Sequence, residues 1–231
     1  MYSKCSNVKK IIFYNNNTCG DFSPQVRYFI FQIKYMSELL LDRFLKVFKD
    51  EILPLTFEGV NLGNKIFGAA IIKKDDYSLV IAGSNNEIKN PLWHGEIHTL
   101  KKFYELDKNI RPNEKNCIFL SSHEPCSLCL SAITFSGFDN FYYLFPYEST
   151  SDEFNIPHDL NILKEVFNIN NGKYMKKNSY WNSYAINNLI EELNTDNKKK
   201  LKDSFNQIKK TYIDLSNKYQ ASKEKNSIPL K

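Results

Sequence analysis

The sequence predicts an α/β fold in which helices cover a sheet of short strands. Residues 66–73 and 79–82 are apolar and rich in β-branched side chains, and the polar residues between them are typical of a hairpin turn. Further along, apolar strand-like runs at 117–121 and 141–145 flank a helical segment at 126–135. This order of strand, helix and strand requires a sheet with covering helices.

The remaining elements follow in chain order. Ser23 and Pro24 form a helix start signal, and residues 25–48 are too apolar on all sides for a free surface helix, so we expect them to pack on the core or on a partner. Pro54 should break or kink the helical path before residues 57–60.

A helix is expected over residues 94–106, because Ile97, Leu100, Phe103 and Tyr104 recur at helical spacing. The simplest role for Phe67, Ile71 and Phe141 is in the core.

The C-terminal third is expected to be helical. Residues 180–193 are predicted to form one helix. A heptad-like apolar stripe follows on a Lys-rich helix, made of Leu201, Phe205, Ile208, Tyr212, Leu215 and Tyr219. Three short heptads are marginal for a coiled coil, so we expect this stripe to dock on the domain or on a second subunit. Residues 221–231 are expected to be frayed.

Two short motifs supply the ligands of a catalytic zinc ion. His94, Cys126 and Cys129 provide one imidazole and two thiolates, and a catalytic zinc takes three protein ligands and leaves one position to water. Glu96 follows the histidine by two residues and is expected to act as the general acid and base. If Pro125 opens a helix, the two cysteines lie one turn apart near its unpaired amides, which favour thiolates.

Each motif also has a simpler interpretation. A Cys-x-x-Cys pair alone is more often half of a structural zinc site or a redox pair. A structural site needs a fourth protein ligand, which His98, His123 or Cys117 could supply. A redox pair has no need of the upstream His-x-Glu, so the combination of both motifs favours an open catalytic site.

His-x-Glu followed by Pro-Cys-x-x-Cys is the signature of the zinc deaminases, and the chain resembles the cytidine deaminase superfamily. The resemblance is closest to the guanine deaminase and tRNA adenosine deaminase branch, through residues 58–63, 67–69, 85–86, 91, 94–96 and 124–133. It implies a three-layer α/β/α domain with about five central strands and both metal-bearing helices on one face. Family members usually carry alanine between the histidine and the glutamate, where this chain has Gly95. The segment from residue 86 to residue 94 looks two residues shorter than the corresponding segment of guanine deaminases.

The resemblance also implies substrate contacts. Asn85 matches an asparagine that hydrogen-bonds the base or ribose, although asparagine is also common in turns. Phe67 could pack on a substrate ring instead of serving the core. Asp152 and Glu153 fall where guanine deaminases carry an acidic loop that reaches the base, and the alternative for them is a solvated charge pair.

These observations predict a zinc-dependent hydrolytic deaminase of a nucleobase or nucleoside, guanine deaminase-like, with one Zn²⁺ per chain. The alternatives are a tRNA adenosine-to-inosine deaminase, a cytidine or deoxycytidylate deaminase, and a non-catalytic zinc-binding interaction protein. A tRNA partner would use the lysines around 198–210 against phosphates, but the chain has only three arginines and none lies near the metal motifs in the sequence. A base or nucleoside therefore ranks above tRNA.

Length and composition complete the prediction. At 231 residues the chain can bury one substantial core with additions, so we expect an N-terminal extension at 1–42, a deaminase domain at 43–165 and a helical extension at 166–231. Five cysteines, two of them assigned to the metal, indicate a reducing cytoplasmic location. No secretory signal or membrane-spanning segment is expected. We expect a homodimer.

Overall fold

A five-stranded mixed sheet forms the centre of the fold. The computed structural model describes residues 24–231, with side chains from residue 36 onward. The strand order is β2-β1-β3-β4-β5, with β1 antiparallel to β2 and β3, and with β3, β4 and β5 parallel to one another. The strands are β1 (Gly68–Lys73), β2 (Leu79–Ser84), β3 (Cys117–His123), β4 (Asn140–Phe145) and β5 (Asn182–Ala185).

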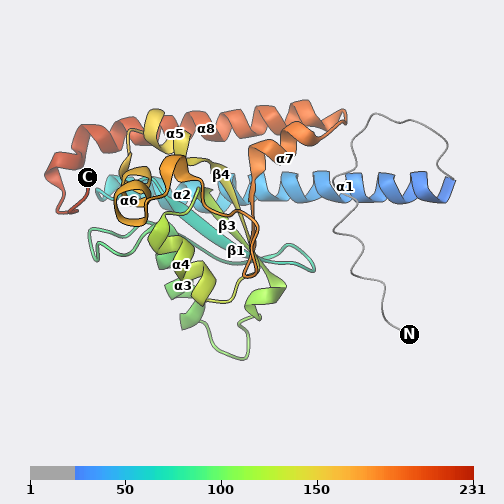
Figure 1. The fold of residues 1–231 in the computed structure, drawn as a ribbon, viewed down its shortest axis with the longest axis horizontal. Helices are drawn as coiled ribbons and strands as arrows, with labels where there is room; N and C mark the ends of the chain where they lie inside the picture. The colour runs from blue at the N-terminus through green and yellow to red at the C-terminus, as the bar shows by residue number, and fades with distance from the viewer. Residues whose placement is uncertain (1–23) are drawn as a thin grey trace. The chain divides into compact units, whose positions relative to one another are not determined.

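Helices cover both faces of this sheet, as the predicted fold class requires. The α-helices of the described residues are α1 (Pro24–Val47), α2 (Leu53–Asn61), α3 (Gly95–Glu105), α4 (Ser127–Phe135), α5 (Tyr147–Asp152), α6 (His158–Phe167), α7 (Ile186–Glu192) and α8 (Asn197–Ser222). The helices α3 and α4 lie on one side of the strands and α8 lies on the other (Figure 1). The chain divides into two units, residues 1–40 and 41–231, and the features described below belong to the second.

The face under α3 and α4 carries an aromatic and aliphatic core. Alternate residues of a strand point to the same face, so Ala69, Phe119 and Phe141 share this side with their neighbours two positions along. Leu100 and Phe103 of α3, Ile133 of α4 and Trp181 complete the cluster. The expectation that both metal-bearing helices cover one face is confirmed.

The opposite face is covered partly by the predicted apolar stripe. All six stripe residues, Leu201, Phe205, Ile208, Tyr212, Leu215 and Tyr219, are buried in α8. The rings of Phe205 and Tyr212 lie 5.8 and 5.2 Å from the ring of Phe145 at the end of β4. The stripe therefore docks on the domain, as expected.

The helical path before the sheet changes geometry ahead of Pro54. A π-helical turn, η2 (Phe48–Ile52), joins α1 to α2, and Pro54 follows it as the second residue of α2. From residue 41 onward the apolar side chains of this run are buried, among them Leu41, Phe44 and Phe48. The predicted start signal at Ser23 lies outside the described residues.

Two expectations for the C-terminal third are wrong. Residues 182–185 form the edge strand β5, and only Ile186–Glu192 are helical, because Trp181 packs on Phe141 while Tyr184 stacks on Tyr142 across the strand pair. The tail is not frayed either, since Ile228 is buried and the Asn226 side chain donates a hydrogen bond to the carbonyl of Gly63.

The segments that form the site meet at one end of the strands. The strand β3 ends at His123, and the antiparallel β1 begins at Gly68, so these two points lie at the same end of the strands, together with the end of β2. Helices α3 and α4 begin here. Within the part of the chain that the structure describes, no helix is long and apolar enough to cross a membrane.

Candidate metal centre and its pocket

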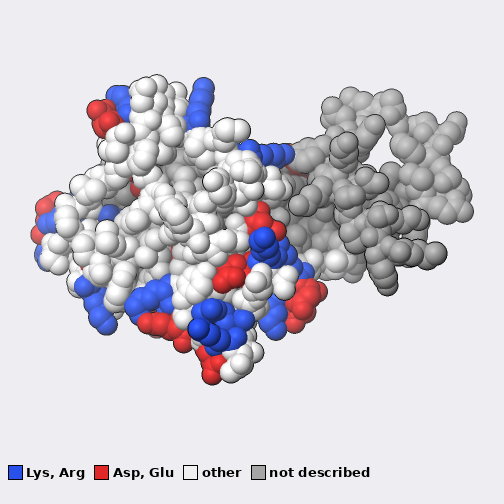
Figure 2. All heavy atoms as spheres, turned by 60° about the horizontal axis from the view of Figure 1, so that its bottom comes forward, with Lys and Arg blue, Asp and Glu red and all other residues white. Residues whose placement is uncertain are grey.

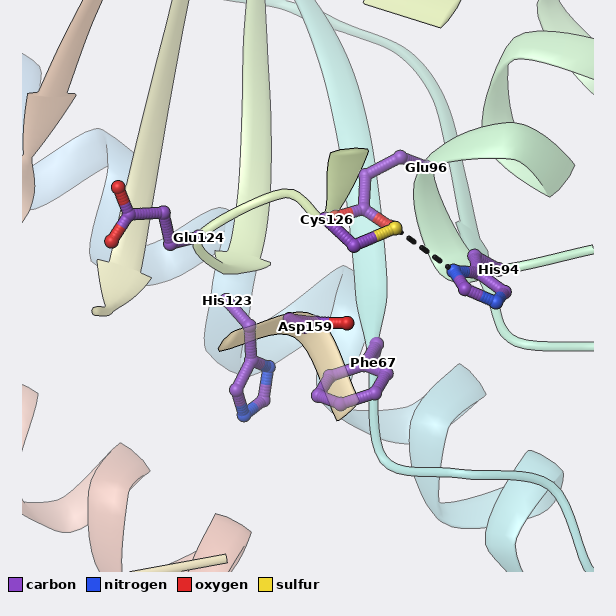
Figure 3. Close-up of a pocket in the computed structure, with 7 residues that line it drawn as sticks. All are labelled: Phe67, His94, Glu96, His123, Glu124, Cys126 and Asp159. Carbon is purple, nitrogen blue, oxygen red and sulfur yellow. Dashed lines mark hydrogen bonds between the residues drawn. The ribbon is translucent and has the colours of Figure 1, made fainter. Parts of the chain in front are cut away.

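Three side chains from the first turns of α3 and α4 converge at this end of the strands. His94 is the N-cap residue of α3, Cys126 is the N-cap residue of α4, and Cys129 lies in the first turn of α4. The helix α3 begins at Gly95, one residue later than expected, and α4 begins at Ser127, two residues after Pro125. The imidazole of His94 points toward Cys126 across the gap between the two helices (Figure 3).

The distances among these three donors fit one tetrahedral zinc ion. His94 Nδ1 lies 3.4 Å from Cys126 Sγ and 3.7 Å from Cys129 Sγ, and the two sulfurs are 3.6 Å apart. A zinc ion at about 2.3 Å from sulfur and about 2.0 Å from nitrogen needs donor separations of roughly 3.5 to 3.8 Å in a tetrahedron. The cluster is therefore positioned to bind one metal ion.

The charges of the cluster are strongly coupled. Burial by itself would lower the pKa of His94, but the hydrogen bond and the negative charge of Cys126 raise it to about 9. The hydrogen bond between the two thiols holds the pKa of Cys126 well below its ordinary value, whereas burial, followed by the hydrogen bond with Cys126 and its charge, raises the pKa of Cys129. A bound cation would stabilise the thiolate form of both cysteines.

Glu96 lies beside the cluster without joining it. Its carboxylate is 4% exposed, accepts a hydrogen bond of 2.9 Å from the Ser121 hydroxyl, and lies 3.3 Å from Cys129 Sγ. The metal-binding group found among the described residues contains only His94 and the two cysteines. Burial, followed by the charge of Cys126, raises the pKa of Glu96, which suits a group that both accepts and returns a proton.

None of the three alternative fourth ligands belongs to the metal-binding group found among the described residues. His98 Nδ1 contacts the carbonyl oxygen of Ser84, and its ring stacks on Trp93. Cys117 begins β3 at the opposite end from the metal centre, and its thiol donates to the carbonyl of Asn113. His123 lines the same pocket, but its Nδ1 is hydrogen-bonded to Ser122. The arrangement favours a metal site with an open position.

Phe67 and Asn85, which were both expected to contact substrate, take different positions relative to the pocket. Phe67 lines the pocket, with its ring 4.5 Å from the ring of His123. Asn85 is buried behind the centre and donates a hydrogen bond of 2.6 Å to Glu87, while its side-chain oxygen has no partner among the described residues.

The acidic pair expected near the base lies outside the pocket. Asp152 and Glu153 are exposed at the end of α5, and Glu153 forms an ion pair of 2.6 Å with Lys209. Asp159, in the first turn of α6, lines the pocket instead. Sequence reasoning missed Asp159, because no motif marks it.

The pocket is small and acidic. Figure 3 shows Phe67 and Asp159 on the side facing Cys126 and His94, while the carboxylate of Glu124 turns away. The cavity measures about 10 Å³, which is the space of about one water molecule. Burial and the negative charges of Cys126 and Glu96 raise the pKa of Asp159 well above its ordinary value.

Glu124, next to the Pro-Cys motif, fixes the loop that carries Cys126. It accepts hydrogen bonds from the Tyr174 hydroxyl at 2.7 Å and from the Tyr147 amide at 3.2 Å. Lys176 lies 2.8 Å away as its counter-ion. These partners satisfy a buried carboxylate that would otherwise be costly, so its role is to hold the metal loop rather than to react.

Comparisons with known proteins agree with this geometry. Residues 48–145 match the family of the cytidine and deoxycytidylate deaminase zinc-binding region. A curated relative, the guanine deaminase of Bacillus subtilis (strain 168), is 34% identical over 97 residues, which are 38% of this chain and 56% of the relative. The chain thus matches little more than half the length of that relative.

Solved structures of deaminases are also similar. A guanine deaminase from Nitrosomonas europaea is 18% identical, with 74% of this chain and 81% of that chain covered and a TM-score of 0.43. The guanine deaminase from Bacillus subtilis is 25% identical, with 58% and 80% covered and a TM-score of 0.43. A chain from a study of A-to-I editing by tRNA:A34 deaminases is 20% identical, with 43% and 70% covered and a TM-score of 0.37.

Proposed function

Because residues 48–145 match the zinc-binding region of the cytidine and deoxycytidylate deaminase family, we propose that this chain is a zinc-dependent hydrolytic deaminase of a nucleobase or nucleoside, of the guanine deaminase type. The observation that carries the proposal is the open three-donor cluster of His94, Cys126 and Cys129 with the buried carboxylate of Glu96 beside it. A purely structural zinc site has no use for that carboxylate.

The residues divide the chemistry between them. A zinc ion held by the three donors would supply a Lewis acid that lowers the pKa of a water molecule toward 7. Glu96 accepts a proton from the attacking water at a carboxylate oxygen and returns protons to the ring nitrogen and the departing amine. Ser121 donates to that carboxylate and keeps it oriented. Water thus replaces the exocyclic amine, and the products are a carbonyl group and ammonia.

The pocket chemistry supports an uncharged purine as substrate. Asp159 faces the same small space as Glu96 and offers oxygen acceptors to the N–H groups of a base such as guanine. The residues that line the pocket include three acids and, among the described residues, no lysine or arginine. A phosphate group would find no lysine or arginine to bind it in this lining, which argues against a nucleotide.

One face of the molecule carries charged side chains of both signs. In Figure 2, lysines and arginines alternate with acidic side chains along the lower rim, and a broad uncharged area separates them from the upper edge. On this face they form no continuous basic track of the kind that a nucleic-acid backbone requires. This face therefore gives no support for tRNA over a free base or nucleoside, and the homodimer and the cytoplasmic location stay predictions.

The test is an ammonia-release assay with purified, zinc-loaded protein and separate guanine, adenine, adenosine, cytidine, deoxycytidylate and anticodon stem-loop substrates. We expect guanine to react fastest. Reaction of the stem-loop alone would contradict the ranking, and no ammonia from any of them would contradict the proposed reaction.

Two variants separate the roles of the residues. Glu96→Ala should keep zinc and lose about 10²- to 10⁴-fold or more in turnover, because the proton carrier is gone. Cys129→Ala should lose the metal as well. Equal zinc loss in both variants would contradict this division.

A further inference from the structure

A second carboxylate, Glu87, lies buried behind the metal centre. It belongs to the loop between β2 and α3, and its side chain is almost fully enclosed. Its Oε1 contacts Lys65 Nζ at 2.9 Å and its Oε2 accepts the Asn85 side-chain amide at 2.6 Å. His94 Nε2 lies 3.8 Å from Oε1. No sequence motif marks this residue, and the proposed reaction gives it no role.

The ion pair of Lys65 and Glu87 is not explained by stability. Removing two charges from water costs several kcal/mol for each ion, and their attraction repays this only with good geometry. Replacing such a pair by neutral side chains of similar volume is often neutral or stabilising. A buried pair next to a metal ligand therefore suggests a task other than holding the loop.

The orientation of the His94 ring indicates a task for Glu87. His94 turns Nδ1 toward the two cysteines, so its other ring nitrogen, Nε2, faces Glu87. An imidazole that binds a metal through Nδ1 carries its proton on Nε2, and such a group is normally held by a carboxylate or carbonyl partner. Glu87 offers that partner, and Lys65 on its other side keeps the carboxylate in its buried position.

We propose that Glu87, held by Lys65, is a positioning residue that fixes the ring of His94 in the orientation and tautomer that bind zinc. The same carboxylate holds the amide of Asn85, so it couples the metal ligand to the segment that follows β2. The inference rests on the zinc site of the proposed function, but not on the identity of the substrate.

The experiment measures the zinc affinity of the whole chain by competition with a chromophoric chelator. Glu87→Gln keeps the shape and an acceptor for Asn85 but removes the charge, and we expect its zinc affinity to fall about 10- to 100-fold. Glu105→Gln is the matched control, because Glu105 is an exposed carboxylate at the end of α3 that pairs with Lys101. Its zinc affinity should stay within twofold of wild type.

A second variant keeps the proposal falsifiable if Glu87→Gln folds poorly with its lysine left unpaired. The double variant Lys65→Met with Glu87→Gln removes both buried charges, so its metal-free stability in urea should be close to wild type. We expect the same 10- to 100-fold loss of zinc affinity in it. Wild-type zinc affinity in the folded double variant would overturn the proposal.

The outcomes also separate this proposal from the proposed function. Weaker zinc binding in both Glu87 variants supports the positioning role even if wild-type protein deaminates none of the substrates. Active wild-type protein whose Glu87 variants bind zinc normally leaves the deaminase standing and refutes the role of Glu87.

Discussion

Gly95, between His94 and the proposed proton carrier Glu96, is expected to tolerate no side chain. A Cβ atom at Gly95 would lie 2.8 Å from both the amide nitrogen and the Cα of Gly68 and 2.9 Å from the carbonyl carbon of Phe67. These are backbone atoms at the start of β1, so no flexible side chain can move aside. Alanine, which the resembling family usually carries here, should therefore be harmful in this chain.

The size of the effect follows from these distances. The start of α3 must move away from β1 by about 0.6 Å to restore an ordinary contact of 3.4 Å. Overpacking of this kind costs about 1–3 kcal/mol, and the better helix propensity of alanine offsets up to about 1 kcal/mol of it. The larger effect is on the site, since a displacement of about 1 Å at catalytic groups can reduce the rate about 10²-fold.

The assay compares Gly95→Ala with wild type in zinc affinity, urea unfolding and kcat for guanine. We expect weaker zinc binding, a loss of about 1–2 kcal/mol in unfolding free energy, and a fall in kcat of about 10-fold or more. Gly137→Ala is the control, because Gly137 has a φ of +83° with open space around its Cβ position. That variant should lose about 1 kcal/mol of stability with unchanged kcat. Wild-type zinc affinity and kcat in Gly95→Ala would refute the reasoning.

Three further expectations follow from the fold and the site. Phe119→Ala should lower the unfolding free energy by about 3–5 kcal/mol in urea denaturation, because Phe119 is fully buried, whereas Phe135→Ala, whose ring is 93% exposed, should change it by less than about 0.5 kcal/mol; similar values for the two would contradict the core assignment. Zinc present at about 100 times its Kd should stabilise the protein by about 2.7 kcal/mol, seen as a higher Tm that a chelator reverses, and an unchanged Tm would count against metal binding to the native state. Burial, followed by the charge of Glu114, raises the pKa of Cys117 to about 11, so its thiol stays protonated and alkylation by iodoacetamide should remain slow at pH 8 and rise only as the pH approaches that value; fast labelling of Cys117 in native protein at pH 8 would be inconsistent with this environment.

The metal ligands could be predicted from sequence because each motif is local. His94 with Glu96 and Cys126 with Cys129 lie within one helical turn of each other, so their spacing alone limits how they can be arranged. The four strands of the hairpin and of the strand-helix-strand segment were predicted for the same reason. Their short, continuous apolar runs are visible without knowledge of distant contacts.

Asp159 and Glu87 could not be found in this way. Asp159 reaches the pocket only because the chain turns back through α5 and α6 after β4, and the more conspicuous Asp152 and Glu153 are left outside. Glu87 stands in a polar loop, and its burial depends on Lys65, which is 22 residues away in the sequence. Long-range pairing of this kind leaves no local pattern.

The missed strand β5 has a related cause. It is only four residues long, and the helix α7 that follows it has Ile186 and Ile190 at helical spacing. The longer periodic signal masked the shorter one. The packing of Trp181 on Phe141 and of Tyr184 on Tyr142, which places the strand at the sheet edge, is a tertiary effect.

The cavity bounded by Phe67 and Asp159 has a kinetic consequence. A purine is many times larger than the one water molecule that this volume admits, so the lining residues leave no room for a purine in the conformation described. Entry and exit each require its walls to separate, and the frequency of that opening sets an upper limit on turnover, however fast the bond-making step is.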